Sequence, residues 1–180
     1  MISTVSQVKK TPPEVLKTPL QARVYQTLAE LHISFERVDT EEAITMEDCM
    51  AIDDKLQVKT VKTLFLCNRQ QTAFYLLVTR GDKPFRSKDF SAALGIPRVS
   101  FAPAALLETM LGTQIGATTI YSVLLDPNGR VQVVLDQEVL DEEFYGCSDG
   151  TTTSYMKVRT QDIYRKFLPF ARHTPTVIEV

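Results

Sequence analysis

The sequence has few of the residues that hold metal ions or cross-link small domains. The three cysteines, Cys49, Cys67 and Cys147, show no CxxC spacing, and only two histidines occur among 180 residues. Zinc sites and disulfide frameworks depend on such residues at short, regular spacings. We therefore expect no metal, cofactor or disulfide framework, and the odd, sparse cysteine count favours the reducing cytoplasm.

Long apolar runs and an excess of positive charge are also missing. Nowhere do about 18 apolar residues run together, which is the length needed to span a membrane, so no membrane partner is expected. Residues 1–17 lack the continuous apolar stretch of a secretory signal. Lys and Arg number 20 against 22 Asp and Glu, a formal net charge of −2. A nucleic-acid partner would therefore be held by a local patch or through one end of the molecule.

The composition that remains is that of one folded domain. A hydrophobic fraction of 44% and a charged fraction of 23% are ordinary for a globular protein, and 180 residues suit a single core. Residues 1–18 are polar and contain Pro12 and Pro13, so we predict a flexible N-terminal arm followed by a domain over residues 19–180.

Hydrophobic periodicity and turn residues predict alternating helices and strands. Helices are expected at Pro19–His32, from Thr40 onward, at Ser87–Leu94, at Pro103–Leu111 and at Thr160–Phe170. Strands are expected at Ser34–Val38, Thr60–Leu66, Ala73–Thr79, Arg98–Phe101, Ile120–Asp126, Val131–Asp136, Phe144–Gly146, Thr152–Arg159 and Thr176–Val180. Because paired strands occur twice without a helix between them, we predict an α/β (α+β) fold with a mixed sheet surrounded by helices.

No strong catalytic motif is present. The sequence contains no GxGxxG, Walker loop, HExxH or GxSxG. His32 and His173 are expected on the surface, at a helix end and in a late loop, so a Cys/His nucleophile is poorly supported.

Lys62 is the first candidate functional residue. It precedes the apolar run Leu64–Leu66, which is predicted to be a core strand. A lysine at the end of such a strand can hold an anionic or carbonyl-bearing ligand, because its ammonium is a point charge with three donors. A side chain that merely extends to solvent at a strand end is the simpler explanation, and the residues alone leave both open.

Two loops could approach a ligand closely. Gly112 and Gly116 are separated by three residues and followed by small hydroxyl residues, so backbone N–H groups there could bind a carbonyl oxygen or carboxylate. The segment 146–153 is small and polar, as a binding loop would be. A plain helix cap and an ordinary surface loop explain these compositions equally well.

These segments, in this order, resemble those of the YbaK/ProX (PrdX-like) aminoacyl-tRNA editing domains from about Thr18 to Val180. Five short segments carry the resemblance: the "K-T/N-L" strand at Val61–Leu66, the "GDK" at Gly81–Lys83, the "LLG…LSFA" at Leu94–Ala102, the "G-x-x-x-G" loop at Gly112–Thr119, and the "LLND…VVLD" hairpin at Leu124–Asp136. The resemblance implies a mixed, partly barrel-like sheet and metal-free hydrolysis of the aminoacyl ester of mischarged tRNA, typically Ala- or Cys-tRNA for proline.

The resemblance also assigns roles to residues. Lys62 and Gly116 would be catalytic, Lys62 by holding the terminal adenosine or its phosphate and Gly116 by gripping the aminoacyl group. The substrate-binding candidates are Thr63, Ala117, Thr118, Thr119, Gly146, Thr151 and Thr152. The candidates for tRNA binding are the basic residues Lys55, Lys59, Lys83, Arg86 and Lys88. The implied partners are tRNA, through its aminoacylated end and acceptor stem, and prolyl-tRNA synthetase as a second candidate.

The sequence departs from the family pattern at two places. Ile120, Tyr121 and Ser122 stand where the family loop usually has proline, an aromatic residue and glycine. Gly146 and Cys147 stand where many members have a histidine. Two functional hypotheses therefore remain: a trans-acting aminoacyl-tRNA deacylase, and a catalytically inactive module of the same fold that binds tRNA or a small molecule.

Overall fold

A five-stranded mixed sheet forms the centre of the protein. The computed structural model describes all residues, 1–180. The strand order is β4 (Ser100–Phe101), β2 (Val61–Cys67), β3 (Phe74–Arg80), β5 (Val131–Asp136) and β8 (Thr176–Ile178). Strands β3, β5 and β8 run parallel, whereas β2 pairs antiparallel with both of its neighbours. A second, antiparallel sheet has the order β1 (Glu36–Asp39), β7 (Ser154–Arg159) and β6 (Phe144–Ser148). The sheets stay open, and neither forms a closed barrel.

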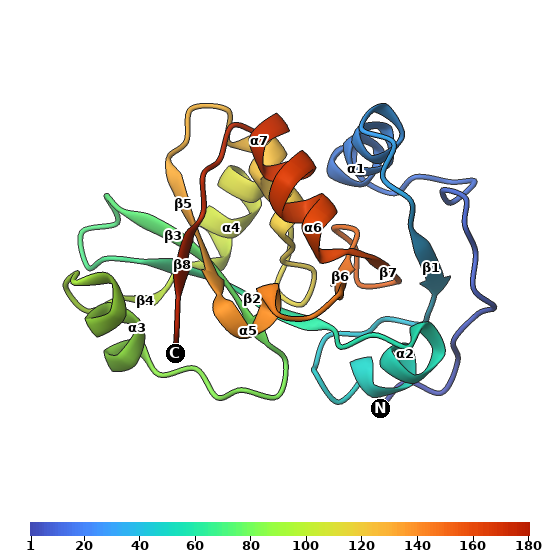
Figure 1. The fold of residues 1–180 in the computed structure, drawn as a ribbon, viewed down its shortest axis with the longest axis horizontal. Coiled ribbons are helices and arrows are strands. Elements are labelled where there is room, and N and C mark those ends of the chain that lie inside the picture. Colours follow the sequence, from blue (N-terminus) through green and yellow to red (C-terminus); the bar gives the residue numbers. More distant parts are fainter.

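Helices surround the two sheets (Figure 1). They are α1 (Pro19–Glu30), α2 (Cys49–Leu56), α3 (Ser87–Leu94), α4 (Ala104–Leu111), the 3₁₀ helix η1 (Ile120–Leu125), α5 (Gln137–Leu140), and the continuous helical stretch of α6 (Thr160–Asp162), η2 (Ile163–Phe167) and α7 (Leu168–Phe170). None of these helices combines the length and the apolar character needed to cross a bilayer.

The large sheet is buried on both faces, and alternate residues of β3 show this. Phe74, Leu76 and Val78 belong to the main core with α1, α4, η1 and η2, while Tyr75 and Leu77 pack against α3 on the other face. Successive side chains of a strand point to opposite faces, so a strand covered on both sides is apolar throughout. Burial on both faces explains why this strand lacks a polar alternation.

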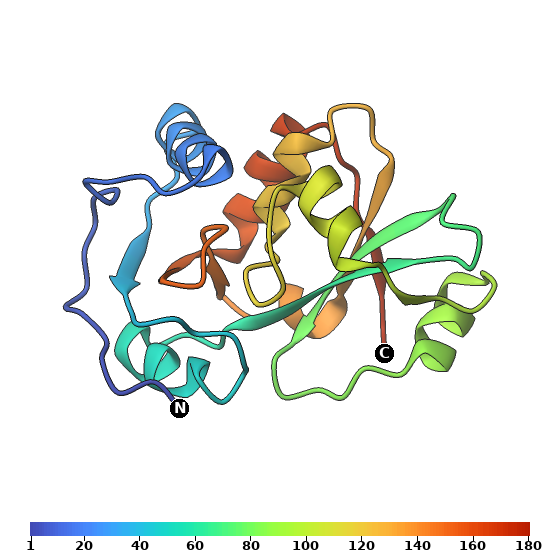
Figure 2. The same cartoon turned by 180° about the vertical axis from the view of Figure 1, so that it is seen from behind.

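The small sheet has its own apolar cluster beneath α2. Val38 of β1 and Tyr155 of β7 pack against Cys49, Ile52 and Leu56 of α2. Residues 1–18 form no helix or extended strand, but the segment lies along β1 through isolated bridges from residue 5 to residue 40 and from residue 9 to residue 37. Figure 2 shows this arm passing around the α2 side of the molecule.

The two sheets meet at a single close backbone contact. Thr60, just before β2, forms a parallel bridge with Gly146 of β6. A Cβ atom on Gly146 would lie 2.8 Å from Cγ1 of Val58 and 3.1 Å from the Cα of Thr60. Any larger residue would therefore push β6 away from the start of β2.

Most of the predicted elements are confirmed near their expected ends. The β2–β3 hairpin forms, and its turn is held by the Asn68 side chain, which accepts from the N–H groups of Thr72 and Ala73. Thr18 caps α1 by accepting from the Gln21 N–H at 3.0 Å. Helix α3 ends at Gly95, whose left-handed backbone is typical of a helix C-terminus.

The predicted strand at Ile120–Asp126 is wrong, and so is the hairpin that it would form with β5. The segment is the 3₁₀ helix η1, and Thr119 caps it by accepting from the Tyr121 N–H. Ile120 to Leu124 are all buried. A short apolar run buried on every side has no periodicity that separates strand from helix, which is why the pattern failed here. Strand β5 pairs instead with the parallel strands β3 and β8.

Two further predictions are corrected. The helix expected from Thr40 begins later, at Cys49, because the Asp48 carboxylate accepts from the N–H groups of Ile44 and Thr45 and holds them in a turn. His173 is buried, with 6% of its surface exposed. Its Nε2 lies 2.9 Å from the carboxylate of Asp126, which also accepts from the backbone after the turn at 127–129.

This buried contact generates a stability prediction. His173→Ala would remove the side-chain partner of the buried Asp126 carboxylate and leave it only the N–H groups of Arg130 and Val131, and the loss of such a buried partner costs about 1–3 kcal/mol. We expect His173→Ala to lose that amount of unfolding free energy in urea, and His32→Ala, at an exposed position, to change it by less than about 0.5 kcal/mol. Equal free energies of unfolding for the two variants would contradict a stabilising contact between His173 and Asp126.

Candidate functional site

A cavity of about 450 Å³ lies between β2 and the loop 112–119. Strand β2 supplies one wall, and the segment before α2, the loop and the ends of β6 and β7 supply the others. The lining residues are Ile44, Met46, Cys49, Thr60–Phe65, Phe101, Ala102, Leu107, Ile115, Gly116, Thr118, Cys147, Ser148 and Tyr155. The cavity thus combines the two segments that the sequence singled out first, the Lys62 strand and the Gly116 loop.

Lys62 is the single charged side chain of this lining. It lies opposite Thr79 of β3, is partly buried, and its Nζ donates to the backbone carbonyl of Lys83. Burial lowers the pKa of the Lys62 ammonium, and the negative charge of nearby Asp82 opposes that shift. The ammonium keeps further N–H donors for a ligand, because lysine has three and one is used.

Gly116 has a backbone that other residues rarely adopt. Its φ is +90°, and a Cβ atom there would lie 2.9 Å from Cγ2 of Ile44. Tyr155 joins the same two segments, since its hydroxyl donates to the Ala43 carbonyl at 2.7 Å and lies 3.5 Å from the Gly116 carbonyl. The loop and the segment before α2 are therefore held against each other over the cavity.

The loop leaves backbone donors free. The Ala117 N–H donates to the Gln114 carbonyl at 3.0 Å, whereas the N–H groups of Gly116 and Thr118 donate to no protein acceptor. Both residues line the cavity. Free N–H groups in a fixed loop form an anion-binding concavity, which suits a carbonyl oxygen that gains negative charge.

The cavity holds no side chain that would act as a strong base or nucleophile. No carboxylate or imidazole lines it. Burial raises the pKa of the Cys49 and Cys147 thiols to about 12, so both are protonated at neutral pH. Because the thiolate is the reactive form of cysteine, neither residue is suited to nucleophilic attack.

The structure brings some of the expected substrate-binding residues together. Thr63 and Thr118 line the cavity with Lys62 and Gly116. Ala117 and Thr119 lie behind this wall: Ala117 is buried, and the Thr119 hydroxyl donates to the Ser148 carbonyl at 2.9 Å.

Gly146, Thr151 and Thr152 do not line the cavity. Gly146 packs on Thr60, as described above. The loop that contains Thr151 is fastened to the core, because the buried Asp149 carboxylate accepts from the hydroxyls of Thr151 and Tyr25, each at 2.7 Å. The small and polar residues of this loop therefore serve an internal network.

Six polar or sulfur-bearing lining residues were missed from the sequence: Met46, Cys49, Thr60, Cys147, Ser148 and Tyr155. The last two belong to β6 and β7, in the small sheet, and reach the cavity only because that sheet docks on β2. Tyr155 is also the residue that links the Gly116 loop to Ala43. Tyr155 lies in a segment that was predicted to be a strand, but no local signal indicated its partner.

The basic residues expected to bind tRNA fall into two groups. Lys59 pairs with Glu142 at 2.7 Å, and Lys83 pairs with Asp136 at 2.6 Å, so carboxylates neutralise both. Lys55, Arg86 and Lys88 are exposed and have no carboxylate within ion-pair distance. Of the five basic residues that the sequence offered for tRNA binding, only these three therefore carry a positive charge that no carboxylate neutralises.

The Gly116 geometry generates a second prediction. Gly116→Ala would add strain from the positive φ, which costs about 1–2 kcal/mol, and would also displace Ile44. Gly129→Ala is the matched control, because Gly129 has a φ of +66° with open space around its Cβ position. We expect Gly116→Ala to lose more unfolding free energy than Gly129→Ala in urea denaturation. Equal losses would show that the Ile44 contact imposes no constraint.

Comparison with known proteins fits this geometry. The family model of the aminoacyl-tRNA editing domain matches residues 40–166. The prolyl-tRNA editing protein ProX of Acetoanaerobium sticklandii is 29% identical over 140 residues, covering 78% of this chain and 85% of its own length. Prolyl-tRNA synthetase associated domain-containing protein 1 of Bos taurus is 28% identical over 160 residues, covering 86% and 90%.

Solved structures show the same fold. A crystal structure assigned as a candidate trans-editing enzyme for prolyl-tRNA synthetase superposes with a TM-score of 0.65 at 16% identity, covering 92% of this chain and 99% of the other. The sequence resemblance is thus confirmed at the level of the family. The chain belongs to the aminoacyl-tRNA editing domain family, of the YbaK/ProX type.

Proposed function

We propose that the protein is a trans-acting deacylase that hydrolyses the ester of a mischarged tRNA, with Ala- or Cys-tRNA for proline as the first candidates. The observation that carries the proposal is the cavity itself: one lysine, Lys62, lines the same apolar space as Gly116 and Thr118, whose N–H groups are free. Family membership supports the reaction class, and the ProX relative is named for prolyl-tRNA editing.

The roles follow from charge and hydrogen-bonding capacity. Lys62 would hold the terminal phosphate or ribose as a point charge and so place the ester in the cavity. The N–H groups of Gly116 and Thr118 would then donate hydrogen bonds to the ester carbonyl oxygen as it gains negative charge. Positioning and oxyanion stabilisation of this kind supply much of the acceleration in acyl transfer.

The attacking water needs a base, and the cavity offers no carboxylate or imidazole. The ribose hydroxyl next to the ester is the group that would activate the water, as a substrate-assisted mechanism requires. The apolar lining, with Leu107 and Ile115 among its residues, suits a small uncharged aminoacyl side chain. Alanine and cysteine both meet this condition.

A second candidate function is a binding module that has lost the chemistry. Its support is that Ile120–Ser122, in place of the family's proline, aromatic residue and glycine, are buried in η1 instead of lining the cavity. Prolyl-tRNA synthetase remains a candidate partner under either function.

The first experiment compares deacylation of Ala-, Cys- and Ser-charged tRNA by the wild type and by Lys62→Ala. We expect turnover that falls by about 10²-fold or more in the variant, the scale seen when a stabilising donor is removed. Arg165→Ala, at an exposed position of η2 outside both cavities, is the control and should keep wild-type turnover. Turnover by all three proteins would move the chemistry away from Lys62, and tRNA binding without turnover by any would favour the binding module.

The two groups of basic residues generate a separate prediction on tRNA affinity. Lys88 has no carboxylate partner, so Lys88→Ala should remove one phosphate contact and reduce the salt slope of binding by about 1. Lys59 is already neutralised by Glu142, so Lys59→Ala should change the slope less. Filter binding of tRNA across a salt series measures both, and identical slopes for the wild type and Lys88→Ala would remove Lys88 from the interface.

A further inference from the structure

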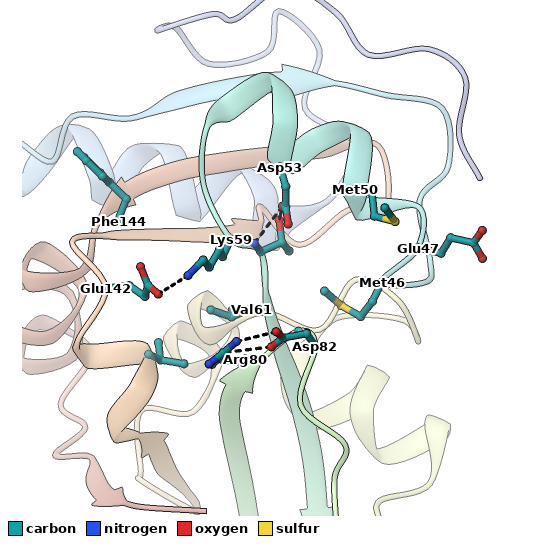
Figure 3. A pocket seen from close by; sticks show the side chains of 13 residues that line it. Met46, Glu47, Met50, Asp53, Lys59, Val61, Arg80, Asp82, Glu142 and Phe144 are labelled. Carbon is teal, nitrogen blue, oxygen red and sulfur yellow. Dashed lines mark hydrogen bonds and ion pairs between the residues drawn. The ribbon is translucent and has the colours of Figure 1, made fainter.

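A second cavity, of about 430 Å³, adjoins the first (Figure 3). It opens between α2, the end of β3 and the segment from α5 to β6. Met46, Thr60 and Val61 line both cavities, so only one layer of residues separates them. A ligand in the first cavity that carries a further group past these shared residues would place that group in the second cavity.

Two ion pairs supply hydrogen-bond donors here. Lys59 pairs with Glu142 at 2.7 Å and Arg80 with Asp82 at 2.6 Å, as the dashed lines in Figure 3 show. Arg80 also pairs with Glu138 at 3.0 Å, so each of its three guanidinium nitrogens donates to a carboxylate. Lys59 and Arg80 still keep N–H groups that the pairing does not use, because lysine has three and arginine five. The cavity therefore presents donors without a net positive field.

Asp53 supplies an acceptor. Its Oδ1 accepts from the Thr60 N–H at 3.0 Å and from the Thr60 hydroxyl at 2.5 Å, so Thr60 fixes the carboxyl group. Its Oδ2 has no protein donor within hydrogen-bond distance. Burial raises the pKa of this carboxyl group, and the Thr60 hydrogen bonds oppose that shift.

Apart from Glu47, the other lining side chains are apolar and adaptable. Met46, Met50, Val139 and Phe144 line the cavity, and 59% of the Met50 surface is exposed. Methionine is unbranched and polarisable, so it packs well against flat aromatic faces. A flat, polar-edged group enclosed by these side chains would contact the donors and the acceptor at its rim.

We propose that this second cavity binds the cytosine base of the nucleotide that precedes the terminal adenosine of tRNA. The inference rests on the proposed function, because every tRNA ends in the unpaired sequence CCA. The adenosine and its ester would occupy the Lys62 cavity. The base before it would pass Met46 and Val61 into the space beside Asp53.

The hydrogen-bonding groups match cytosine and mismatch uracil. The exocyclic amino group of cytosine donates, as carboxylates require, so it would bond to Asp53 Oδ2. Its ring nitrogen and carbonyl oxygen accept, and Lys59 and Arg80 offer donors. Uracil has a carbonyl oxygen in place of the amino group. That oxygen and Asp53 Oδ2 are both acceptors, so no hydrogen bond would form between them.

The test is base discrimination by short single strands. The trinucleotides CpCpA and CpUpA are titrated against the wild type and Asp53→Asn, with binding followed by NMR. The wild type should prefer CpCpA by roughly tenfold, in line with a well-placed base contact. Asp53→Asn should reverse the preference, because the amide oxygen can still accept from Thr60 while the amide nitrogen now donates to the uracil carbonyl.

Asp54→Asn is the matched control, since Asp54 is the exposed neighbour on α2 and lies outside the cavity. It should keep the wild-type preference. Equal affinity of the wild type for the two strands, or no binding of either, would overturn the proposal. These readouts need no turnover, so they are independent of the deacylation assay: a base preference without hydrolysis supports the subsite while the deacylase proposal fails.

A second measurement serves if Asp53→Asn does not fold. The methyl signal of Met50, which lines only the second cavity, should shift when wild-type protein binds CpCpA and stay in place with adenosine monophosphate alone. The Met46 methyl, at the boundary, should respond to both. If CpCpA shifts the Met46 methyl signal but leaves the Met50 signal in place, the base binds elsewhere and the proposal is overturned.

Discussion

The close approach of Gly146 to Thr60 is the constraint on which the rest of the structure depends. It is the one backbone bridge that joins the small sheet to the large one. Because β6 lies against the start of β2, the next residues of both strands, Lys62 and Thr63 on one and Cys147 on the other, line one cavity. A side chain at position 146 would separate them, so this glycine is required for packing and need not touch a substrate.

The site that results separates two kinds of recognition. The first cavity is apolar with one cation and free backbone N–H groups, which suits an ester and a small side chain. The second is bounded by paired charges and the Asp53 carboxyl, which suits the hydrogen-bonding edge of a base. Met46 stands between them, and Gly81 leaves room for it, because a Cβ there would lie 2.3 Å from the Met46 methyl carbon.

Caps, turn residues and hydrophobic patterns predicted much of this fold, because interactions between residues close in the sequence determine these features. The cap at Thr18, the left-handed Gly95 and the Lys62 strand each depend on a few neighbouring residues. The failures depend on tertiary contacts. Ile120–Leu124 is buried throughout, so its pattern does not distinguish a helix from a strand. His173 is buried in contact with Asp126, 47 residues earlier, whose carboxylate lies 2.9 Å from its Nε2. The contribution of Tyr155 to the cavity wall also depends on tertiary contacts, so the sequence did not predict it.

The small sheet also constrains how the chain folds. Strand β1 pairs with β7 in a register that places Glu36 opposite Lys157, so this sheet cannot form until segments far apart in the chain have met. Closing such a long loop carries an entropic cost before any contact compensates it, and topologies rich in distant pairs fold slowly. The wall that Tyr155 contributes to the cavity therefore depends on this distant pairing, and both sheets must assemble before the cavity exists.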